Sequence, residues 1–205
     1  MASQEPLLGS SVHDAAQRAA DLIDVLVPRP GRRDEAGQAC LRDERARLTA
    51  VLRDHGETGP IEVSDTDLAG LRRAALDLRH VFAASDVTAA AERINHLLAG
   101  HAHPPRLTSH GGESGWHLHV DGDDDAPWAE WFLTSSCLAL AVLLAERQAP
   151  PAGLCAAQSC GRPFVNVGRG AARRYCSHLC GTRERVARHR AIQAGGELNG
   201  GAVKG

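Results

Sequence analysis

The sequence predicts an α+β protein, with a mostly helical N-terminal domain that carries one small β-hairpin and a small C-terminal cysteine module. Three observations support this class. Apolar residues make up 43% of the 205 residues but aromatic residues only 3%, so alanine, leucine and valine must fill the core. Such a composition favours helices, and apolar residues recur at helical spacing through much of the first 147 residues. Four of the six cysteines fall within residues 155–180.

Four helices are expected in the first half of the chain. Ser64 and Asp67 have the spacing of a capping box, which marks the start of the third helix. Asp86 is a side chain of the kind that caps helices, and it precedes the fourth. Pro28 ends the first helix. The expected helices cover residues 12–27, 35–53, 64–82 and 87–99.

A β-hairpin and a long helix are expected next. Residues 106–110 and 116–120 flank a glycine-rich turn, which is typical of a hairpin. The acidic turn 121–125 is expected to cap a helix over residues 127–147. The alternation in the second strand predicts apolar side chains on the inner face (Trp116, Leu118 and Val120) and histidines on the outer face (His117 and His119).

The pattern of four cysteines is Cys155-x4-Cys160-x15-Cys176-x3-Cys180. Two short pairs separated by a loop supply the four thiolates that Zn²⁺ binds in a tetrahedron. The second pair spans one turn at the start of a helix expected over residues 179–194, and Gly161 lets backbone N–H groups approach the thiolates. We therefore predict a structural zinc ion in a treble-clef-like module. Four unconnected free thiols are the alternative.

This zinc site is closed by its four protein ligands, which argues against zinc catalysis. The sequence also contains no Ser-His-Asp pattern, phosphate-binding glycine loop or placed carboxylate pair, so we do not expect an enzyme. The two other cysteines, Cys40 and Cys137, are interpreted as buried structural thiols. His117 and His119 share a strand face and would form part of a second metal site, but no carboxylate or cysteine at ligand spacing completes it.

Charge is divided unequally along the chain. Residues 1–150 hold 14 arginines and 23 acidic residues, a net charge of −9, whereas residues 151–205 carry +7. Around the cysteines, eight arginines including Arg162 and Arg169 face Glu184 alone; a zinc ion with four thiolates contributes −2 and leaves about +5. Such a module attracts phosphates. The predicted nucleic-acid contacts are Arg173, Arg174, Arg183, Arg185, Arg188 and Arg190.

The arginines of the last expected helix fall on two sides. Arg183 and Arg190 share one side, and Arg185 and Arg188 share nearly the opposite side. Both pairs cannot face one groove. One pair would instead pack on the acidic domain or bridge phosphates across a groove. A solvated arginine-rich helix without a partner is the remaining interpretation.

The cysteine module resembles the CGNR zinc-finger proteins, a bacterial family with an N-terminal ABATE domain. The matching elements are Cys160-Gly161, Phe164-Val165-Asn166, Arg173-Arg174-Tyr175-Cys176 and Cys180-Gly181-Thr182-Arg183. Upstream, residues 67–72 and 94–98 and the hairpin before a long helix resemble the ABATE half. Asn166 stands where the family usually has aspartate, and Thr182 replaces the asparagine of the name motif. The resemblance implies a stress-responsive transcription regulator whose finger binds DNA and whose N-terminal domain senses a ligand.

The sequence thus leads to a zinc-binding DNA-binding regulator as the first hypothesis. A protein-docking module stabilised by zinc and a zinc–thiolate redox switch are the alternatives. Expected partners are DNA and a small-molecule ligand of the N-terminal domain, with no membrane, and a homodimer if the DNA site is palindromic. A start without signal-peptide features and an apolar stretch limited to residues 138–145 predict a cytoplasmic protein. The expected divisions are a disordered N-terminus (1–11), an ABATE-like domain (12–149), a linker (150–153), the finger (154–193) and a disordered tail (194–205).

Overall fold

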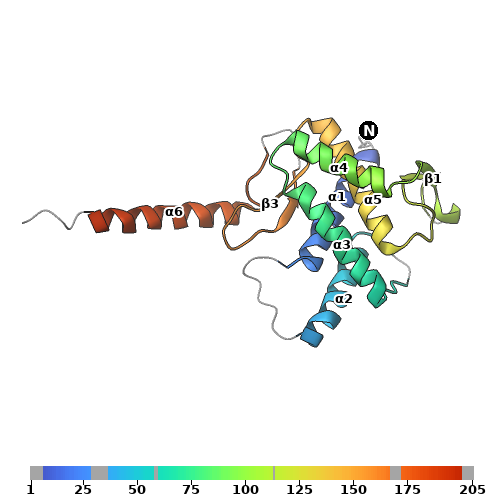
Figure 1. Cartoon of the computed structure of the whole chain (residues 1–205), viewed down its shortest axis with the longest axis horizontal. Coiled ribbons are helices and arrows are strands. Elements are labelled where there is room, and N and C mark those ends of the chain that lie inside the picture. Colours follow the sequence, from blue (N-terminus) through green and yellow to red (C-terminus); the bar gives the residue numbers. More distant parts are fainter. Residues whose placement is uncertain (1–6, 29–36, 58–59, 113, 167–171, 200–205) are drawn as a thin grey trace, which may run out of the picture.

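The computed structural model describes residues 7–28, 37–57, 60–112, 114–166 and 172–199. Helix α5 packs against α1, α3 and α4, and α6 extends away from this bundle (Figure 1). The predicted α+β class is confirmed. In chain order the described elements are α1 (Leu7–Leu26), α2 (Gly37–Asp54), α3 (Asp65–Phe82), α4 (Val87–His101), β1 (Arg106–Thr108), a 3₁₀ turn (His110–Gly112), β2 (His117–His119), α5 (Trp128–Arg147), β3 (Ala152–Leu154), β4 (Pro163–Val165) and α6 (His178–Asn199).

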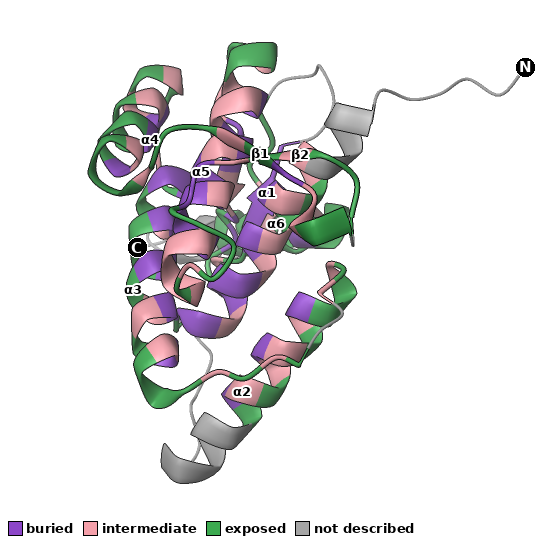
Figure 2. Cartoon of the chain, turned by 90° about the vertical axis from the view of Figure 1, so that its right-hand side faces the viewer, coloured by how far each residue is buried: buried purple, intermediate pink, exposed green. Residues whose placement is uncertain are grey.

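The main core lies where the helices of the bundle meet, and Figure 2 shows the buried residues on the facing sides of α1, α3 and α5. Aliphatic side chains dominate it, as the low aromatic content requires. Only two of its largest fully buried side chains are aromatic. These fully buried side chains are Phe82, Phe132, Leu22, Ile23, Leu48, Leu52, Leu68, Leu71, Leu78, Ile94, Leu140 and Leu143.

The predicted helix starts at Ser64 and Asp86 are confirmed. The Ser64 side chain accepts a hydrogen bond from Asp67 N, and the Asp67 side chain accepts one from Ser64 N, which completes a capping box. Asp86 accepts from Ala89 N at 2.9 Å. Helix α1 begins at Leu7, five residues before the expected start, and α6 continues to Asn199. The other residues of the two expected disordered ends, 1–6 and 200–205, lie outside the described part of the chain.

Helix α5 has a longer apolar stretch than residues 138–145. It has 20 residues, and an 18-residue window within it has a mean hydropathy of 1.6, so that by length and composition alone it could cross a membrane. Buried helices of globular proteins have the same composition, and α5 is packed on three helices of the bundle. Cys137 lies in it and is buried, as expected, and burial raises the pKa of its thiol to about 12.

The hairpin forms where it was predicted, but the predicted orientation of its second strand is wrong. Trp116 is 75% exposed and Leu118 46% exposed, whereas the side chain of His119 is only 12% exposed. The reason is the carboxylate of Asp121, which is 3% exposed and therefore needs hydrogen-bond donors. His119 and Arg106 supply them from the inner face. Val120, beyond the end of β2, is buried as expected.

The acidic turn does not cap α5, so that prediction is also wrong. The N-cap position of α5 is Pro127, which makes no side-chain cap bond. Two carboxylates of the turn instead bind the hairpin: Asp121 and Asp124 both accept hydrogen bonds from Arg106, at 2.9 and 2.6 Å. A guanidinium is a stronger partner for a carboxylate than a backbone N–H, because both groups are charged.

The expected linker, residues 150–153, includes the start of a β-strand. Its last two residues begin β3, which pairs antiparallel with β4 so that Gly153 lies opposite Phe164. Ala152 and Val165, an opposed pair, are buried in the main core of the helical domain. The β3–β4 ribbon therefore joins the cysteine module firmly to the bundle.

Candidate metal centre

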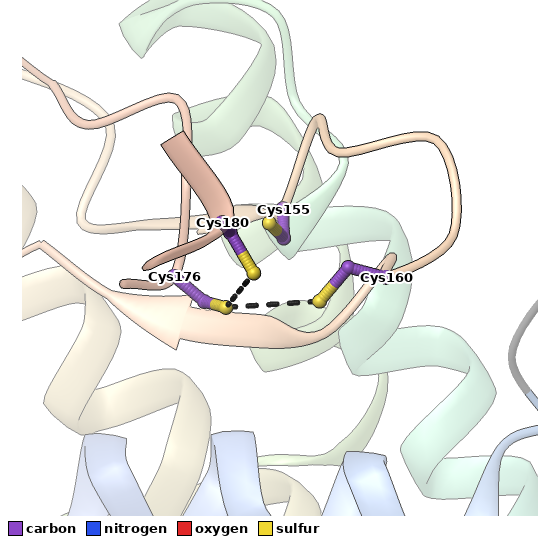
Figure 3. A group of neighbouring side chains, drawn as sticks. All are labelled: Cys155, Cys160, Cys176 and Cys180. Atoms are coloured by element: carbon purple, nitrogen blue, oxygen red, sulfur yellow. Dashed lines mark hydrogen bonds between the residues drawn. The ribbon is translucent and has the colours of Figure 1, made fainter. Parts of the chain in front are cut away.

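The four predicted ligands come together from the β3–β4 connection and from the start of α6 (Figure 3). Cys155 follows β3, Cys160 lies in the connection to β4, Cys176 precedes α6, and Cys180 lies in the first turn of α6. All four Sγ atoms lie within 4.8 Å of one another. The grouping predicted from spacing is thus present in space, and the four cysteines are positioned to bind a metal ion.

The distances between sulfur atoms fit one tetrahedral ion. The Sγ of Cys176 lies 3.7 Å from the Sγ of Cys160 and 3.7 Å from that of Cys180. Four thiolates bound to Zn²⁺ at about 2.3 Å would be separated by about 3.8 Å along each edge of the tetrahedron. A disulfide would instead bring two sulfurs to about 2.0 Å. The donor set and its dimensions therefore fit a zinc ion.

The thiols have shifted acidities. Burial raises the pKa of the Cys160 and Cys176 thiols, whereas a hydrogen bond with the Ser177 side chain lowers the pKa of Cys180. Thiols with raised pKa values release protons when they bind a metal. A dication supplies the positive charge that several closely spaced thiolates require.

The first cysteine pair sits in a tight turn of the type that binds zinc. Gly161, directly after Cys160, has φ +59°, a left-handed conformation that glycine adopts without a Cβ clash. Cys160 N donates to Ala157 O, and Cys155 N donates to Arg162 O, both at 2.9 Å. These bonds fix the two thiol-bearing backbones relative to each other. The role predicted for Gly161 is consistent with this geometry.

The module has only a small apolar core of its own. Cys155, Ala157, Phe164 and Cys180 are its buried members, so two of the four are also metal ligands. Phe164 covers Gly153, where an added Cβ would lie 2.8 Å from the ring. Glycine is therefore needed at position 153 for the ribbon to carry the aromatic ring. A core of this size depends on the metal for its stability.

Asn166 joins the module to the chain segment that leads out of α5. It is 2% exposed; its Nδ2 donates to Pro150 O at 3.0 Å, and its Oδ1 accepts from Arg173 N at 3.2 Å. An aspartate would lack the donor for Pro150 O and would place two acceptors together. Asparagine at this position thus has a structural explanation in this chain.

The predicted nucleic-acid residues fall into two groups. Arg173 donates to Val165 O at 2.6 Å and stacks over Phe164, and Arg174 stacks over Tyr175, so these two contact their own module. The second group lies on α6; all six arginines are exposed to solvent, but none of this second group stacks on an aromatic ring among the described residues of the module. Its members are Arg183, Arg185, Arg188 and Arg190.

The remaining polar residues near the cysteines have structural contacts. Thr182 accepts a hydrogen bond from Arg185 at 3.2 Å. Glu184 accepts one from Gln158 N at 2.9 Å and so ties α6 to the first cysteine turn. Arg162 pairs with Asp24 of α1, with Nε 3.2 Å from Oδ2, which raises the pKa of Arg162. Arg169 and the side chain of Cys40 lie outside the described residues.

The geometry of four cysteines on a knuckle and a helix defines a zinc-finger type of module. Residues 152–193 match the family model of the CGNR zinc finger, a segment that contains all four cysteines. The match covers about a fifth of the chain, so the ABATE-like character of residues 12–149 stays a prediction. A comparison of the chain with curated proteins finds no match.

A second group of ligand-type side chains exists in the described residues. His110, His117 and His119 have ligand nitrogens within 4.8 Å of one another. The sequence pointed to His117 and His119 but not to His110, which lies in the turn before β2 and has a positive φ of 48°. Spacing did not indicate it, because the turn between β1 and β2 folds it back onto the strand.

Proposed function

We propose that this protein is a zinc-dependent DNA-binding regulator in which α6 contacts the phosphate backbone. The observation that carries the proposal is the position of α6, which leaves the zinc module and extends away from the bundle with four exposed arginines (Figure 1). None of these four arginines forms an ion pair with a carboxylate of the described residues. Their charge is therefore available to an anionic partner.

The arrangement of the arginines fits a helix in a DNA groove. The pair Arg183 and Arg190 and the pair Arg185 and Arg188 lie on nearly opposite sides of α6. Neither pair packs on the acidic domain, since all four side chains are exposed. A helix that lies in the major groove, about 12 Å wide, has a phosphate backbone on either side. The two pairs would then contact the two strands.

The exposure of α6 also supports the proposal that this helix binds a partner. Between residues 185 and 193 every described side chain of the helix is exposed, so that this part of the helix has no buried face. A helix without a packed face is only marginally stable in water. Binding along a nucleic acid supplies the contacts that the described part of the chain does not make with this segment.

The experiment is a salt titration of the zinc-loaded protein on duplex DNA. Arg185→Ala/Arg188→Ala removes two charges from α6, and the matched control Arg53→Ala/Arg73→Ala removes two exposed charges from the helical domain. The slope of log Kobs against log salt is negative, and each lost phosphate contact reduces its magnitude by about 0.9. We expect the magnitude of the slope to decrease by roughly 1.8 in the first variant and to stay unchanged in the control.

Absence of binding at low salt would refute the proposal. In that case the module is a protein-docking element, for which exposed Leu179, Val186 and Ile192 on α6 are the surface to test. Release of zinc by low doses of peroxide, with loss of activity, would instead favour the redox switch. Cytoplasmic location, a ligand for the N-terminal domain and the absence of enzymatic activity are further parts of the proposal.

A further inference from the structure

The hairpin brings three imidazoles together at a distance from the cysteine module. His117 and His119 lie on the same face of β2, and the positive φ of His110 turns its ring back onto them. The ring centroids are 4.8 to 5.2 Å apart. A left-handed backbone is uncommon for a non-glycine residue and is held in place by its surroundings. Such conformations concentrate at binding sites.

The contacts of the Nδ1 atoms define which nitrogen each ring presents to the others. His117 Nδ1 lies 2.7 Å from Gly115 O, and His119 Nδ1 lies 2.9 and 3.0 Å from the two carboxylate oxygens of Asp121. His110 Nδ1 faces Asp124 at 3.5 Å. Carbonyl and carboxylate oxygens only accept hydrogen bonds, so these short contacts favour a proton on Nδ1 of His117 and His119, although Arg106 also lies 3.5 Å from Nδ1 of His119. In the neutral forms of these two rings Nε2 then carries a lone pair.

Two of the Nε2 atoms face each other. The Nε2 atoms of His110 and His117 are 3.0 Å apart. At this distance either one ring donates an N–H to the other, or both nitrogens bind one metal ion. Two nitrogens bound to one ion at about 2.05 Å are separated by about 2.9 Å at a right angle and about 3.3 Å at the tetrahedral angle. The observed distance falls within this range.

Carboxylates lie beside these imidazoles, as they do beside metal-binding histidines. Ligand histidines usually donate their second N–H to a carboxylate or carbonyl, which fixes the ring and increases its basicity. Here Asp121 and Asp124 take that place, and Arg106 binds both of them. Thr108 adds a hydrogen bond to Asp124 at 3.0 Å. Two carboxylates and one guanidinium leave a net negative charge beside the imidazoles, which favours a dication.

The cluster opens onto a cavity. The three histidines line one side of a cavity of about 500 Å³, and Trp128, Trp131 and Asp123 line other parts of it. We propose that His110, His117 and His119 bind a divalent transition-metal ion of the zinc class, with its open coordination position facing this cavity. Three histidines leave a position for water or a small-molecule donor, whereas the four-cysteine centre is closed. The two centres are therefore chemically different.

The test counts metal ions in the full-length, untagged protein after it has been loaded with Zn²⁺ and freed of loose metal. We expect about two zinc ions per chain in the wild type. His110→Asn removes one imidazole and keeps a residue that tolerates a left-handed backbone, and it is expected to retain about one ion. The matched control His96→Asn changes an exposed histidine of α4 and is expected to retain about two.

Two further variants separate the sites and guard against misfolding. Cys176→Ser is expected to lose the thiolate-to-metal absorption of the Co²⁺-loaded protein and keep the weaker bands of cobalt bound to nitrogen. Asp121→Asn leaves the imidazoles in place and is expected to weaken metal affinity about 10–100-fold. Circular dichroism checks that each variant is folded.

A wild type that holds only one ion, which Cys176→Ser abolishes, would overturn the proposal. So would a His110→Asn variant that keeps two ions. With a single ion in the wild type, the Nε2 atoms of His110 and His117 are joined by an N–H···N hydrogen bond and the hairpin holds no metal. The result does not depend on DNA binding, because neither measurement involves nucleic acid.

Discussion

The helical domain and the zinc-finger module are stabilised by different means. The domain buries a continuous apolar core between α1, α3, α4 and α5, whereas the separate apolar cluster of the module has four buried residues, of which two are candidate thiol ligands. Apolar burial stabilises a protein roughly in proportion to the area removed from water, so the first region can fold by itself. The second region has too small a core of its own for this, so we expect a bound metal ion to stabilise it.

Removal of zinc should separate the two regions most strongly. Structural zinc sites contribute apparent binding free energies of about 10–16 kcal/mol, so a chelator is expected to unfold the module and α6. The bundle should remain folded, because none of the four cysteines belongs to its core. Circular dichroism and calorimetry with and without chelator measure this, with Cys137→Ala as a variant that keeps zinc. Persistence of α6 in the chelated protein would contradict it.

Acidification should act on the module before the bundle. Thiols whose pKa burial has raised, such as Cys176, hold protons at neutral pH and must release them to the solvent when the metal binds. Zinc affinity therefore rises with pH and falls as pH is lowered, by at most roughly 10⁴-fold per pH unit for four thiols. Competition with a metal indicator between pH 6 and 8 measures the slope. An affinity independent of pH would mean that the thiols are not the ligands.

Truncation of a side chain in the bundle core should destabilise the bundle and leave the metal content of the module unchanged. Phe82→Ala removes a fully buried ring and is expected to lower the free energy of unfolding of the bundle by about 3–5 kcal/mol. Zinc content should be unchanged in the folded protein. Urea denaturation measures the loss, and Leu76→Ala, at a position that is 48% exposed, is the control. Equal losses in both variants would show that α3 is not packed as described.

A change at the boundary should affect both regions slightly. Asn166→Asp removes the hydrogen bond to Pro150 O and buries a carboxylate beside a carbonyl, at an expected cost of about 1–3 kcal/mol. Because the position lies between the module and the bundle, thermal unfolding and zinc affinity should both decrease. Asn95→Asp, at an exposed position, is the control. A neutral result would mean that the boundary is held by the ribbon alone.

The cysteine group and the helix caps could be predicted from the sequence more fully than the direction in which the hairpin side chains point. The cysteine spacing predicted the four thiols that lie together and are positioned to bind a metal ion, and the Ser64 and Asp86 caps marked the helix starts, because each cysteine pair and each cap involves residues a few positions apart. The hairpin faces were predicted wrongly, since apolar alternation gave no weight to the buried carboxylate of Asp121. Its donors, His119 and Arg106, belong to different strands. His110 was overlooked for a similar reason: its conformation depends on the turn rather than on spacing.

Because the module is attached to the bundle at one end of α6, a small rotation at that end moves the far end of the helix by a larger distance. The β3–β4 ribbon is anchored in the main core through Ala152 and Val165 and carries the zinc knuckle on Phe164. Helix α6 has 22 residues and is therefore about 33 Å long. A rotation of about ten degrees at its base would displace the far end by roughly 6 Å, more than the length of one helical turn. Small adjustments in the packing of the bundle would thus be amplified at the arginine-bearing helix.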